Sequence, residues 1–267
     1  MQQSKPYLIV GDIHNKVEKA ESIMRAFDAT HTIVQVGDVF DAFHDTPEDA
    51  QYTAEWLKHS ITKTNRIHLL GNHDLPYHPC STAGALMYDC PGYSKEKHAA
   101  VKKVMAFKDW EHLHIYHVAH GWLVTHAGLH PRFLYDTKNP LEKALVALRR
   151  TTERFENRLW DYLLGGIGMA RCGHDQTGGV VWLDHFEEAK AIEGLNQVYG
   201  HSPTQNAHIL YAETTQNVNI DTYLQEVLEI QPDGKAQLLS VASNDYRITA
   251  SPISNKVILA PNQLVAA

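Results

Sequence analysis

The sequence has few cysteines and no long run of apolar or of basic residues. Its 267 residues include only three cysteines, Cys80, Cys90 and Cys172, and no two of them have Cys-x-x-Cys spacing. This odd, scattered set argues against a disulfide framework or a zinc ribbon and favours a reducing compartment. The apolar runs fall far short of the roughly 20 residues that a membrane-spanning helix needs. We therefore expect no membrane partner.

Basic clusters and an N-terminal targeting segment are also missing. No run of lysine and arginine exceeds two residues, and the formal net charge is −7, which argues against nucleic acid as a partner. No basic segment leads into a long apolar stretch at the N-terminus, so we expect no signal peptide and a cytoplasmic location. The chain is 43% hydrophobic and 21% charged, which is typical of a globular protein with a substantial core.

What the first third of the chain does contain is an alternation of apolar strands and amphipathic helices. Residues 7–10, 33–36 and 67–70 predict buried strands, and the spacing of apolar residues over 16–29 and 47–64 predicts helices. This order is typical of an α/β fold with a parallel sheet. A polar cluster follows each strand at the same end, where parallel sheets hold their binding residues.

The predicted strand ends carry side chains of metal-ligating types. Asp12 and His14 are two residues apart, so in an extended segment they face the same side and can share a metal ion. The Asp38 carboxylate has two oxygens and can bridge two cations. Oxygen and nitrogen ligands without a thiolate suit Mn, Fe, Zn or Mg. The candidate metal ligands are Asp12, His14, Asp38, Asn72, His126 and His201.

This ligand set predicts a two-metal phosphoesterase. Two ions roughly 3.5–4 Å apart can hold a bridging hydroxide, lower its pKa and neutralise the charge of a phosphoryl group during in-line attack. The departing alkoxide then needs a proton. His73, next to Asn72, is suited to be that general acid, and a hydrogen bond from its ring to Asp41 would orient the ring and raise its pKa.

The remaining chain predicts one domain with additions. We expect a single domain over 1–250, with an inserted, cap-like segment at about 75–120 that influences substrate choice, and a loose tail over 251–267. The pattern of residues 139–164 predicts a helix, and residues 207–250 alternate as antiparallel strands do.

The motifs around these residues resemble, in order and spacing, those of the calcineurin-like metallophosphoesterases over roughly residues 7–205. They are Gly11-Asp12-Ile13-His14, Gly37-Asp38-Val39-Phe40-Asp41, Gly71-Asn72-His73-Asp74, His126-Ala127-Gly128 and Gly200-His201-Ser202-Pro203. The resemblance implies a four-layer αββα sandwich of two mixed β-sheets flanked by helices. It also implies two metal sites that share Asp38, one with Asp12 and His14 and the other with Asn72, His126 and His201. In the same pattern His73 is the general acid, with Asp41 behind it.

The sequence is most similar in pattern to the phosphoprotein phosphatase branch, which includes bacteriophage lambda phosphatase and bacterial diadenosine tetraphosphatase. Residues Asn219-Ile220-Asp221-Thr222 resemble the NIDTG element of that branch, with Tyr223 in place of its glycine. Phosphodiesterase and nuclease branches usually carry GHxH, but Pro203 stands where the second histidine would be. This departure favours monoester or pyrophosphate chemistry over cleavage of diesters.

A second departure concerns the phosphate-binding arginine. Protein phosphatases of this branch usually read GDxxDRG, whereas Ala42 and Phe43 follow Asp41 here. Arg171 is our candidate for the substrate-binding role, ahead of Arg149 and Arg150.

The leading hypothesis is a metal-dependent phosphatase that acts on phosphomonoesters of proteins or small molecules with two divalent ions, preferably Mn. The alternative is a hydrolase of dinucleoside polyphosphates such as diadenosine tetraphosphate. It would require an aromatic wall for adenine, for which the segment 75–120 offers Tyr77, Tyr88, Tyr93 and Trp110. A phosphodiesterase and an inactive metal-binding scaffold are further alternatives. The sequence leaves open the physiological substrate, the metal used in the cell and the oligomeric state.

Overall fold

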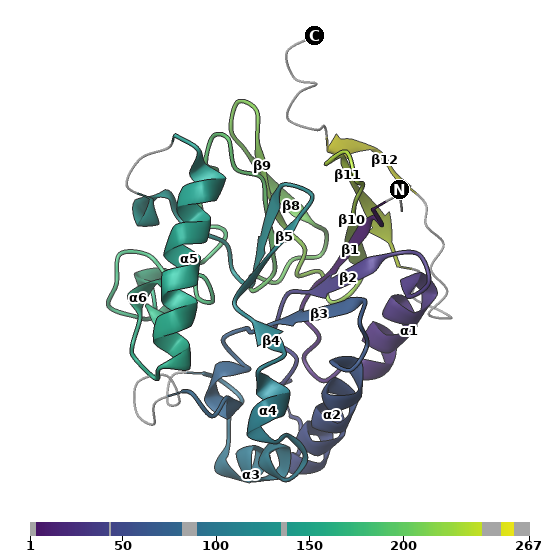
Figure 1. The fold of residues 1–267 in the computed structure, drawn as a ribbon, viewed down its shortest axis with the longest axis vertical. Helices are drawn as coiled ribbons and strands as arrows, with labels where there is room; N and C mark the ends of the chain where they lie inside the picture. The colour runs from purple at the N-terminus through teal and green to yellow at the C-terminus, as the bar shows by residue number, and fades with distance from the viewer. Residues whose placement is uncertain (1–3, 43, 82–89, 135–137, 242–251, 259–267) are drawn as a thin grey trace.

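Two mixed β-sheets form the centre of the molecule (Figure 1). The structure is a computed structural model and describes residues 4–42, 44–81, 90–134, 138–241 and, as backbone, 252–258. The first sheet has the strand order β12 (Pro252–Ile258), β11 (Ala236–Ser240), β10 (Glu226–Ile230), β1 (Tyr7–Val10), β2 (Thr32–Gln35), β3 (Arg66–Leu69) and β4 (Leu113–His114). The second has the order β5 (Tyr116–Ala119), β6 (Trp122–Thr125), β7 (Gln197–Tyr199), β9 (Gln216–Asn219) and β8 (His208–Tyr211).

Both sheets have a parallel part that ends at the same region of the molecule. Strands β1 to β4 are parallel to one another, and β10 to β12 join β1 as antiparallel neighbours. In the second sheet, β6, β7 and β9 are parallel, and the edge strands β5 and β8 are antiparallel to them.

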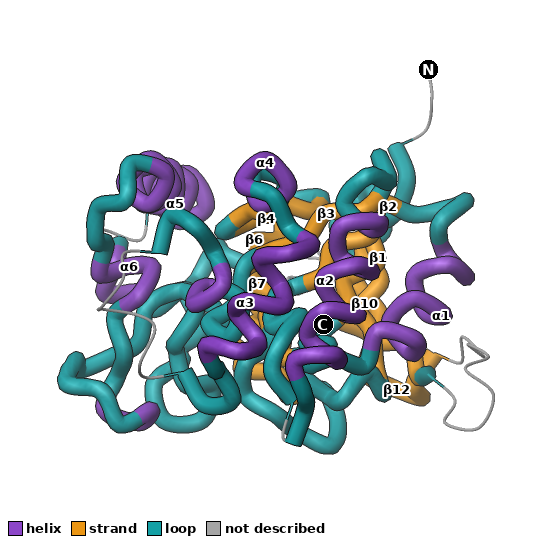
Figure 2. Tube along the Cα trace, turned by 90° about the horizontal axis from the view of Figure 1, so that it is seen from below, coloured by secondary structure: helices purple, strands orange, loops and turns teal. Residues whose placement is uncertain are grey.

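Helices cover the outer faces of the sheets, which gives the predicted four-layer αββα sandwich. The α-helices are α1 (Val17–Phe27), α2 (Pro47–Ser60), α3 (Lys95–Val104), α4 (Phe107–Trp110), α5 (Pro140–Glu156) and α6 (Tyr162–Gly165), and three short 3₁₀ turns are η1 (Leu75–Tyr77), η2 (Pro131–Phe133) and η3 (Met169–Arg171). Seen from below, most strands lie between α5 on one side and α1 on the other, and α2 and α3 overlap them in this view (Figure 2). Within the described part of the chain, no helix combines the length and apolar character needed to cross a membrane.

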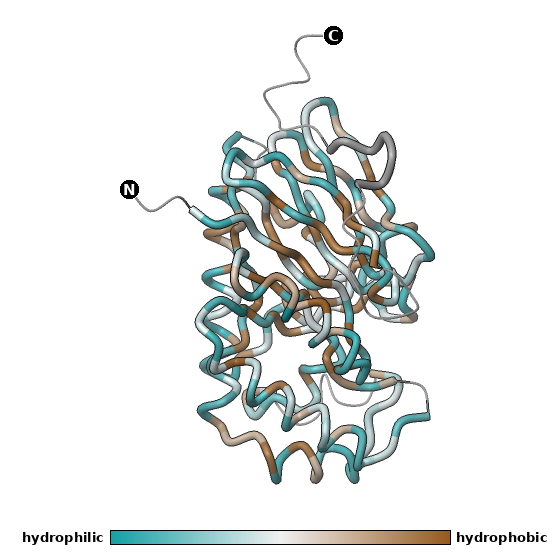
Figure 3. The backbone as a smooth tube through the Cα atoms, turned by 90° about the vertical axis from the view of Figure 1, so that its right-hand side faces the viewer, coloured by the Kyte–Doolittle hydropathy of each residue, from teal (hydrophilic) through white to brown (hydrophobic). Residues whose placement is uncertain are grey.

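Strand β1 is apolar along its whole length because both of its faces are buried. In β1, Leu8 and Val10 join the core that also contains the inner side of α1, whereas Ile9 joins the core between the two sheets. In Figure 3, hydrophobic stretches run through the middle of the molecule. Sheets covered on both sides read as continuous apolar runs in the sequence, as residues 7–10 do.

Local signals in the sequence explain where helix α2 begins. Helix α2 starts at the Thr46 cap, whose side chain accepts from the backbone N–H of Asp49 while Asp49 accepts from the backbone of Thr46. This reciprocal capping box satisfies two amide donors at the helix start, and Pro47 occupies the first turn. Helices α1 and α2 end a few residues before the predicted limits of 29 and 64.

The segment 75–120 is more integrated than an inserted cap. Its strands belong to the two sheets, since β4 is an edge of the first and β5 an edge of the second, and α3 packs against α2. Residues 82–89 of this segment lie outside the described residues. In the predicted tail, Pro252–Ile258 pairs with β11 as β12, so its backbone is not a loose end. The other tail residues, 251 and 259–267, lie outside the described residues.

Candidate metal centre

Five loops meet where the parallel strands of both sheets end. The loops after β1, β2 and β3 carry Asp12, Asp38 and Asn72, and the ends of β6 and β7 bring His126 and His201 from the opposite sheet. These five side chains are buried, each with at most 7% of its surface exposed. The structure therefore brings residues that are up to 189 positions apart, such as Asp12 and His201, into one polar cluster.

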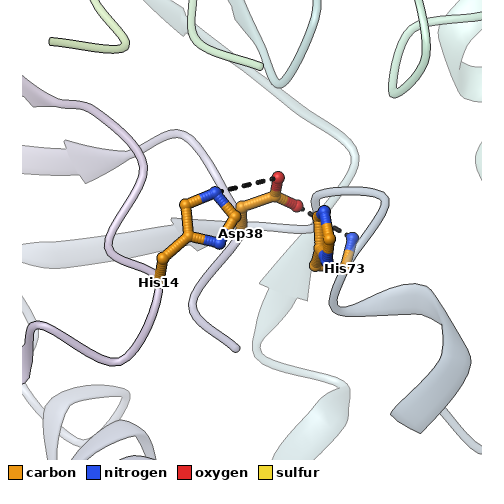
Figure 4. Close-up of side chains that lie close together, drawn as sticks. All are labelled: His14, Asp38 and His73. Atoms are coloured by element: carbon orange, nitrogen blue, oxygen red, sulfur yellow. Dashed lines mark hydrogen bonds and ion pairs between the residues drawn. The ribbon is translucent and has the colours of Figure 1, made fainter. Parts of the chain in front are cut away.

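Asp38 lies in the middle of the cluster. Its Oδ2 atom is 3.7 Å from Nε2 of His14 and 3.4 Å from Nε2 of His126. Its Oδ1 atom accepts a hydrogen bond of 2.9 Å from the backbone N–H of His73. Figure 4 shows the carboxylate between the rings of His14 and His73. A carboxylate with one oxygen facing imidazoles from two different loops has the geometry of a bridging ligand.

The first half of the cluster is formed by Asp12 and His14. Nδ1 of His14 lies 2.7 Å from the backbone oxygen of Asp41, so this nitrogen carries the proton and donates it, which leaves the Nε2 lone pair facing Asp38. Oδ2 of Asp12 accepts from the backbone N–H of His201 at 3.0 Å, whereas Oδ1 of Asp12 is buried without a hydrogen-bond partner. A buried carboxylate oxygen without a partner is costly unless a cation binds it. The donor set of this half therefore fits a divalent ion.

The second half is formed by Asn72, His126 and His201. One end of the Asn72 amide is 2.9 Å from Nε2 of His126 and 2.8 Å from Nδ1 of His201. Nδ1 of His126 donates to the backbone oxygen of Val36 at 3.0 Å, which turns its Nε2 lone pair inward. In the absence of an ion the amide nitrogen would suit this position, because it could donate to Asp38 and to both imidazoles. With a cation, the oxygen orientation adds a ligand, so this half also fits a divalent ion.

The charged groups of the cluster shift one another's pKa values. Burial raises the pKa of Asp12 well above its usual value, and the nearby carboxylates of Asp221 and Asp38 raise it further. Burial alone would also raise the pKa of Asp38, but the imidazoles of His126, His73 and His14 hold it well below its usual value. Burial, with the charges of His126 and Arg171, lowers the pKa of His201 well below normal. The His201 imidazole is thus held neutral, which is the form in which a histidine binds a metal ion.

His73 and Asp41 face one another at the rim of this cluster. Nδ1 of His73 is 3.5 Å from Oδ2 of Asp41, which is longer than a well-formed hydrogen bond. Burial lowers the pKa of His73, but the charge of Asp38 and the contact with Asp41 outweigh it, so the pKa is raised well above its usual value. The predicted pair is thus brought together, with its imidazole in the form that can donate a proton.

Four residues near the cluster were missed by sequence reasoning. Asp74 accepts from the backbone N–H groups of Asp38, Val39 and Gly71, which joins the loops after β2 and β3. An aspartate closely following a strand end is the signal that could have revealed it. The other three are Tyr77, Cys90 and Lys97, which contact Asp41, Asn72 and Asp41 respectively.

Arg171 lies beside the cluster on η3. Its Nη2 atom donates to Oγ of Ser202 at 2.8 Å, and its Nε is 2.8 Å from Oδ2 of Asp184. The backbone oxygen of His201 is 3.5 Å from the same Nη2. Among the arginines considered from the sequence, Arg149 instead bonds to Leu145 within its own helix. Arg171, in contrast to Arg149, thus contacts a residue of the polar cluster, His201.

The aromatic side chains proposed as a wall for adenine do not form one in the described residues. Tyr77 and Trp110 are 4% and 3% exposed and pack against Phe40 in the core. Tyr93 packs against Tyr77. Tyr88 lies outside the described residues.

Comparison with known proteins identifies the family of the chain. The family model described as calcineurin-like phosphoesterase matches residues 5–205. A cold-active protein-tyrosine phosphatase of a psychrophile, Shewanella SP., has a similar structure, with a TM-score of 0.56 and 12% identity over 89% of this chain and 78% of that chain. A metallophosphoesterase from Sphaerobacter thermophilus has a TM-score of 0.44 and 13% identity over 90% of this chain and 89% of that chain. At 12% identity, the Shewanella structure bears on the fold alone. None of the curated proteins matches the chain.

Proposed function

Because the chain belongs to the calcineurin-like phosphoesterase family, whose members hydrolyse phosphoric esters, we propose that it is a metal-dependent phosphatase acting on phosphomonoesters. The substrate would be a phosphoprotein or a small molecule. The observation that carries this proposal is the position of Asp38, whose carboxylate lies between imidazoles of both sheets and next to His73. Such a centre serves hydrolysis rather than simple ion storage, because a proton donor stands at its edge.

We assign the metal ligands as the sequence analysis does. Asp12 and His14 would hold one ion, Asn72, His126 and His201 would hold the other, and Asp38 would bridge them. When bound, two divalent ions supply a nucleophilic water and Lewis-acid stabilisation of the phosphoryl group. Mn²⁺ is our preferred ion, since the ligands are carboxylate, amide and imidazole without thiolate.

The protein side chains divide the remaining tasks. His73 faces Asp41 with Nδ1, so Nε2 is the atom that would donate a proton to the leaving oxygen. Asp41 keeps the imidazolium form stable and fixes its ring. Arg171 would bind the phosphate in place of the arginine that is absent after Asp41, which its contacts with Ser202 and His201 support.

Two further points belong to this proposal. Pro203 stands where diesterases of the family have a second histidine, which supports monoesters over diesters. All three cysteines, Cys80, Cys90 and Cys172, have free thiols, which supports a reducing compartment and hence the cytoplasm.

The test compares hydrolysis of p-nitrophenyl phosphate, bis-p-nitrophenyl phosphate and diadenosine tetraphosphate with and without Mn²⁺. We expect Mn²⁺-dependent turnover with the monoester as the best substrate. With phenyl phosphate, a monoester whose poor leaving group needs a proton, His73→Asn should lower kcat by about 10²- to 10⁴-fold, the usual contribution of a general acid, whereas the exposed His112→Asn should leave it unchanged. Preferential cleavage of the diester or of the dinucleotide would replace the monoesterase proposal with the corresponding alternative.

A further inference from the structure

The carboxylate behind His73 is held by two buried donors that come from the segment after β3. Oδ1 of Asp41 accepts from the hydroxyl of Tyr77 at 2.6 Å and from Nζ of Lys97 at 3.0 Å. Asp41, Tyr77 and Lys97 are exposed by only 4%, 4% and 5%. A lysine this buried is rare unless it is paired, so its place at this carboxylate requires an explanation.

Both donors bind the same oxygen, and this fixes the direction of the other one. With Oδ1 occupied by Tyr77 and Lys97, Oδ2 of Asp41 faces Nδ1 of His73. The backbone of Asp41 is also constrained, since it has a positive φ of 59° and Gly92, with φ of 90°, packs against its Cβ atom. The carboxylate therefore has little freedom to turn away from His73.

Lys97 also connects this carboxylate to the loop after β1. Its Nζ atom is 2.8 Å from Oδ1 of Asp45, and Oδ2 of Asp45 accepts from the side chain of Asn15. Burial alone would lower the pKa of Lys97, but its bonds to Asp45 and Asp41 raise it overall, so the lysine is charged. Burial and the charge of Asp41 raise the pKa of Tyr77, so its hydroxyl is a donor.

We propose that Lys97 and Tyr77 are positioning residues for catalysis: they hold Asp41 so that its second oxygen orients the ring of His73 toward the leaving group. This inference rests on the proposed function, in which His73 is the proton donor. Helix α3 and turn η1, which carry the two donors, thereby take part in the chemistry. Among the described residues, the side-chain hydrogen bonds of Tyr77 and Lys97 go to Asp41 and Asp45 and not to the assigned metal ligands.

The readout is the dependence of rate on the leaving group, because a proton donor matters most for a poor leaving group. Loaded with Mn²⁺, Lys97→Met and Tyr77→Phe should lower kcat about tenfold for phenyl phosphate, since a small misplacement of a catalytic group is costly. For p-nitrophenyl phosphate the loss should be below about twofold, and KM should not change for either substrate. Lys103→Met, an exposed position on the same helix, is the matched control. Equal losses for both substrates would overturn the proposal.

A double-mutant cycle separates positioning of His73 from other effects. In the His73→Asn background, adding Lys97→Met should cause no further loss with phenyl phosphate, because the group that it positions is already gone. Multiplicative losses would show that Lys97 acts elsewhere and would contradict the inference.

An NMR measurement tests the contact of Lys97 and Tyr77 with the pair of His73 and Asp41 without requiring that the protein hydrolyse any substrate. In ¹⁵N-histidine-labelled protein, the Nδ1–H signal of His73, assigned by its loss in His73→Asn, should shift in Lys97→Met and Tyr77→Phe but not in Lys103→Met. An unchanged signal in both would refute the positioning role even if all monoesters are cleaved. If wild type cleaves no monoester but the signal shifts, the proposed function fails while the contact with His73 stands. Tyr77→Phe, which removes a single oxygen, covers the case in which Lys97→Met does not fold.

Discussion

At the scale of single residues, Gly200 determines where the Asp12 carboxylate can lie. A Cβ atom added to Gly200 would overlap Oδ1 of Asp12. That oxygen is buried and has no hydrogen-bond partner, and it is the one we assign to a metal ion. The absence of a side chain at position 200 is thus a requirement of the metal site, separate from any demand of backbone conformation.

We therefore expect Gly200→Ala to lower metal content and activity together. Displacing Asp12 removes a ligand of one ion, and changes next to metal ligands typically cost 10- to 100-fold in affinity or activity. Metal analysis and Mn²⁺ titration of activity measure both. Gly121→Ala is the control: its φ of 88° makes alanine unfavourable, but nothing lies within 4 Å of the added atom. If Gly200→Ala binds as much Mn²⁺ as Gly121→Ala, the assignment of Asp12 as a ligand is wrong.

Residues of the candidate site differ in how well the sequence could predict them. Asp12, Asp38 and Asn72 directly follow apolar runs, and parallel strands bring their ends to one edge, so their meeting could be inferred. Lys97 could not be inferred. It stands among charged residues in 95–103, a pattern typical of a solvated helix face, and its burial depends on carboxylates that lie 52 and 56 positions away.

At the scale of elements, Arg66 joins the beginning of β3 to helix α1. Its side chain, only 1% exposed, pairs with Glu21 at 2.5 Å and with Asp28 at 2.7 Å. Glu21 lies within α1, and Asp28 caps its C-terminal end. The arginine also donates to the hydroxyl of Ser60 at the end of α2. One side chain thus connects α1 and α2 to the first sheet, whose strands β1, β2 and β3 precede Asp12, Asp38 and Asn72.

We expect Arg66→Met to lower the free energy of unfolding by about 2–4 kcal/mol. Breaking a fully buried ion pair typically costs somewhat more. The value is reduced because Glu21 and Asp28 are 23% and 26% exposed and can regain water. Urea unfolding measures the change, with the exposed Arg25→Met as control. A loss below 0.5 kcal/mol, typical of an ordinary surface substitution, would mean that this cluster does not hold the helices.

The ion pairs of Arg66 also predict how the stability difference between wild type and Arg66→Met depends on pH. Burial alone would raise the pKa of Asp28, but its bonds to Arg66 and Asn65 lower it from 3.8 to about 2. A carboxyl whose pKa is depressed by folding stabilises the protein above its unfolded pKa, and this stabilisation is lost as the pH falls toward the folded pKa. The stability gap between wild type and Arg66→Met should therefore narrow between pH 4 and pH 2. A constant gap over this range would show that Asp28 contributes nothing to it.

Helices and strands could be predicted where the local sequence determines them, and not where pairing with a distant strand determines them. The bounds of β1, β2 and α2 are close to those predicted at 7–10, 33–36 and 47–64. Burial on both faces produces an apolar run in the local sequence of the strands, and the residues of the capping box are adjacent to the helix in the sequence. The helix expected over 139–164 is instead divided into α5 and α6, with residues 157–161 between them. Strands β4 and β5 were missed because each is a short edge strand whose existence depends on the neighbour that it pairs with.

At the scale of the whole molecule, the candidate metal centre joins the two sheets. Asp12, Asp38 and Asn72 follow strands of the first sheet, whereas His126 and His201 follow strands of the second. Between the sheets there is a continuous apolar core, so the sandwich does not depend on metal for its existence. At the ligand end, however, buried carboxylates and imidazoles replace apolar contacts, and bound cations would be the main attraction across the interface.

Removal of metal should therefore lower the stability of the whole domain and not only its activity. A ligand that binds only the folded state at a free concentration of 100 times its Kd adds about 2.7 kcal/mol. For a domain of this size, that corresponds to roughly 5–10 °C in Tm. We expect EDTA to lower Tm by about this amount, and Mn²⁺ to restore it. In Asp38→Asn, which removes the bridging ligand, neither EDTA nor Mn²⁺ should change Tm. Without this carboxylate, the cluster has less negative charge for cations to neutralise, and the cations form a weaker link between the two sheets. If EDTA extracts the ions from wild type without changing Tm, the metals do not couple the two sheets, and their role is confined to the chemistry.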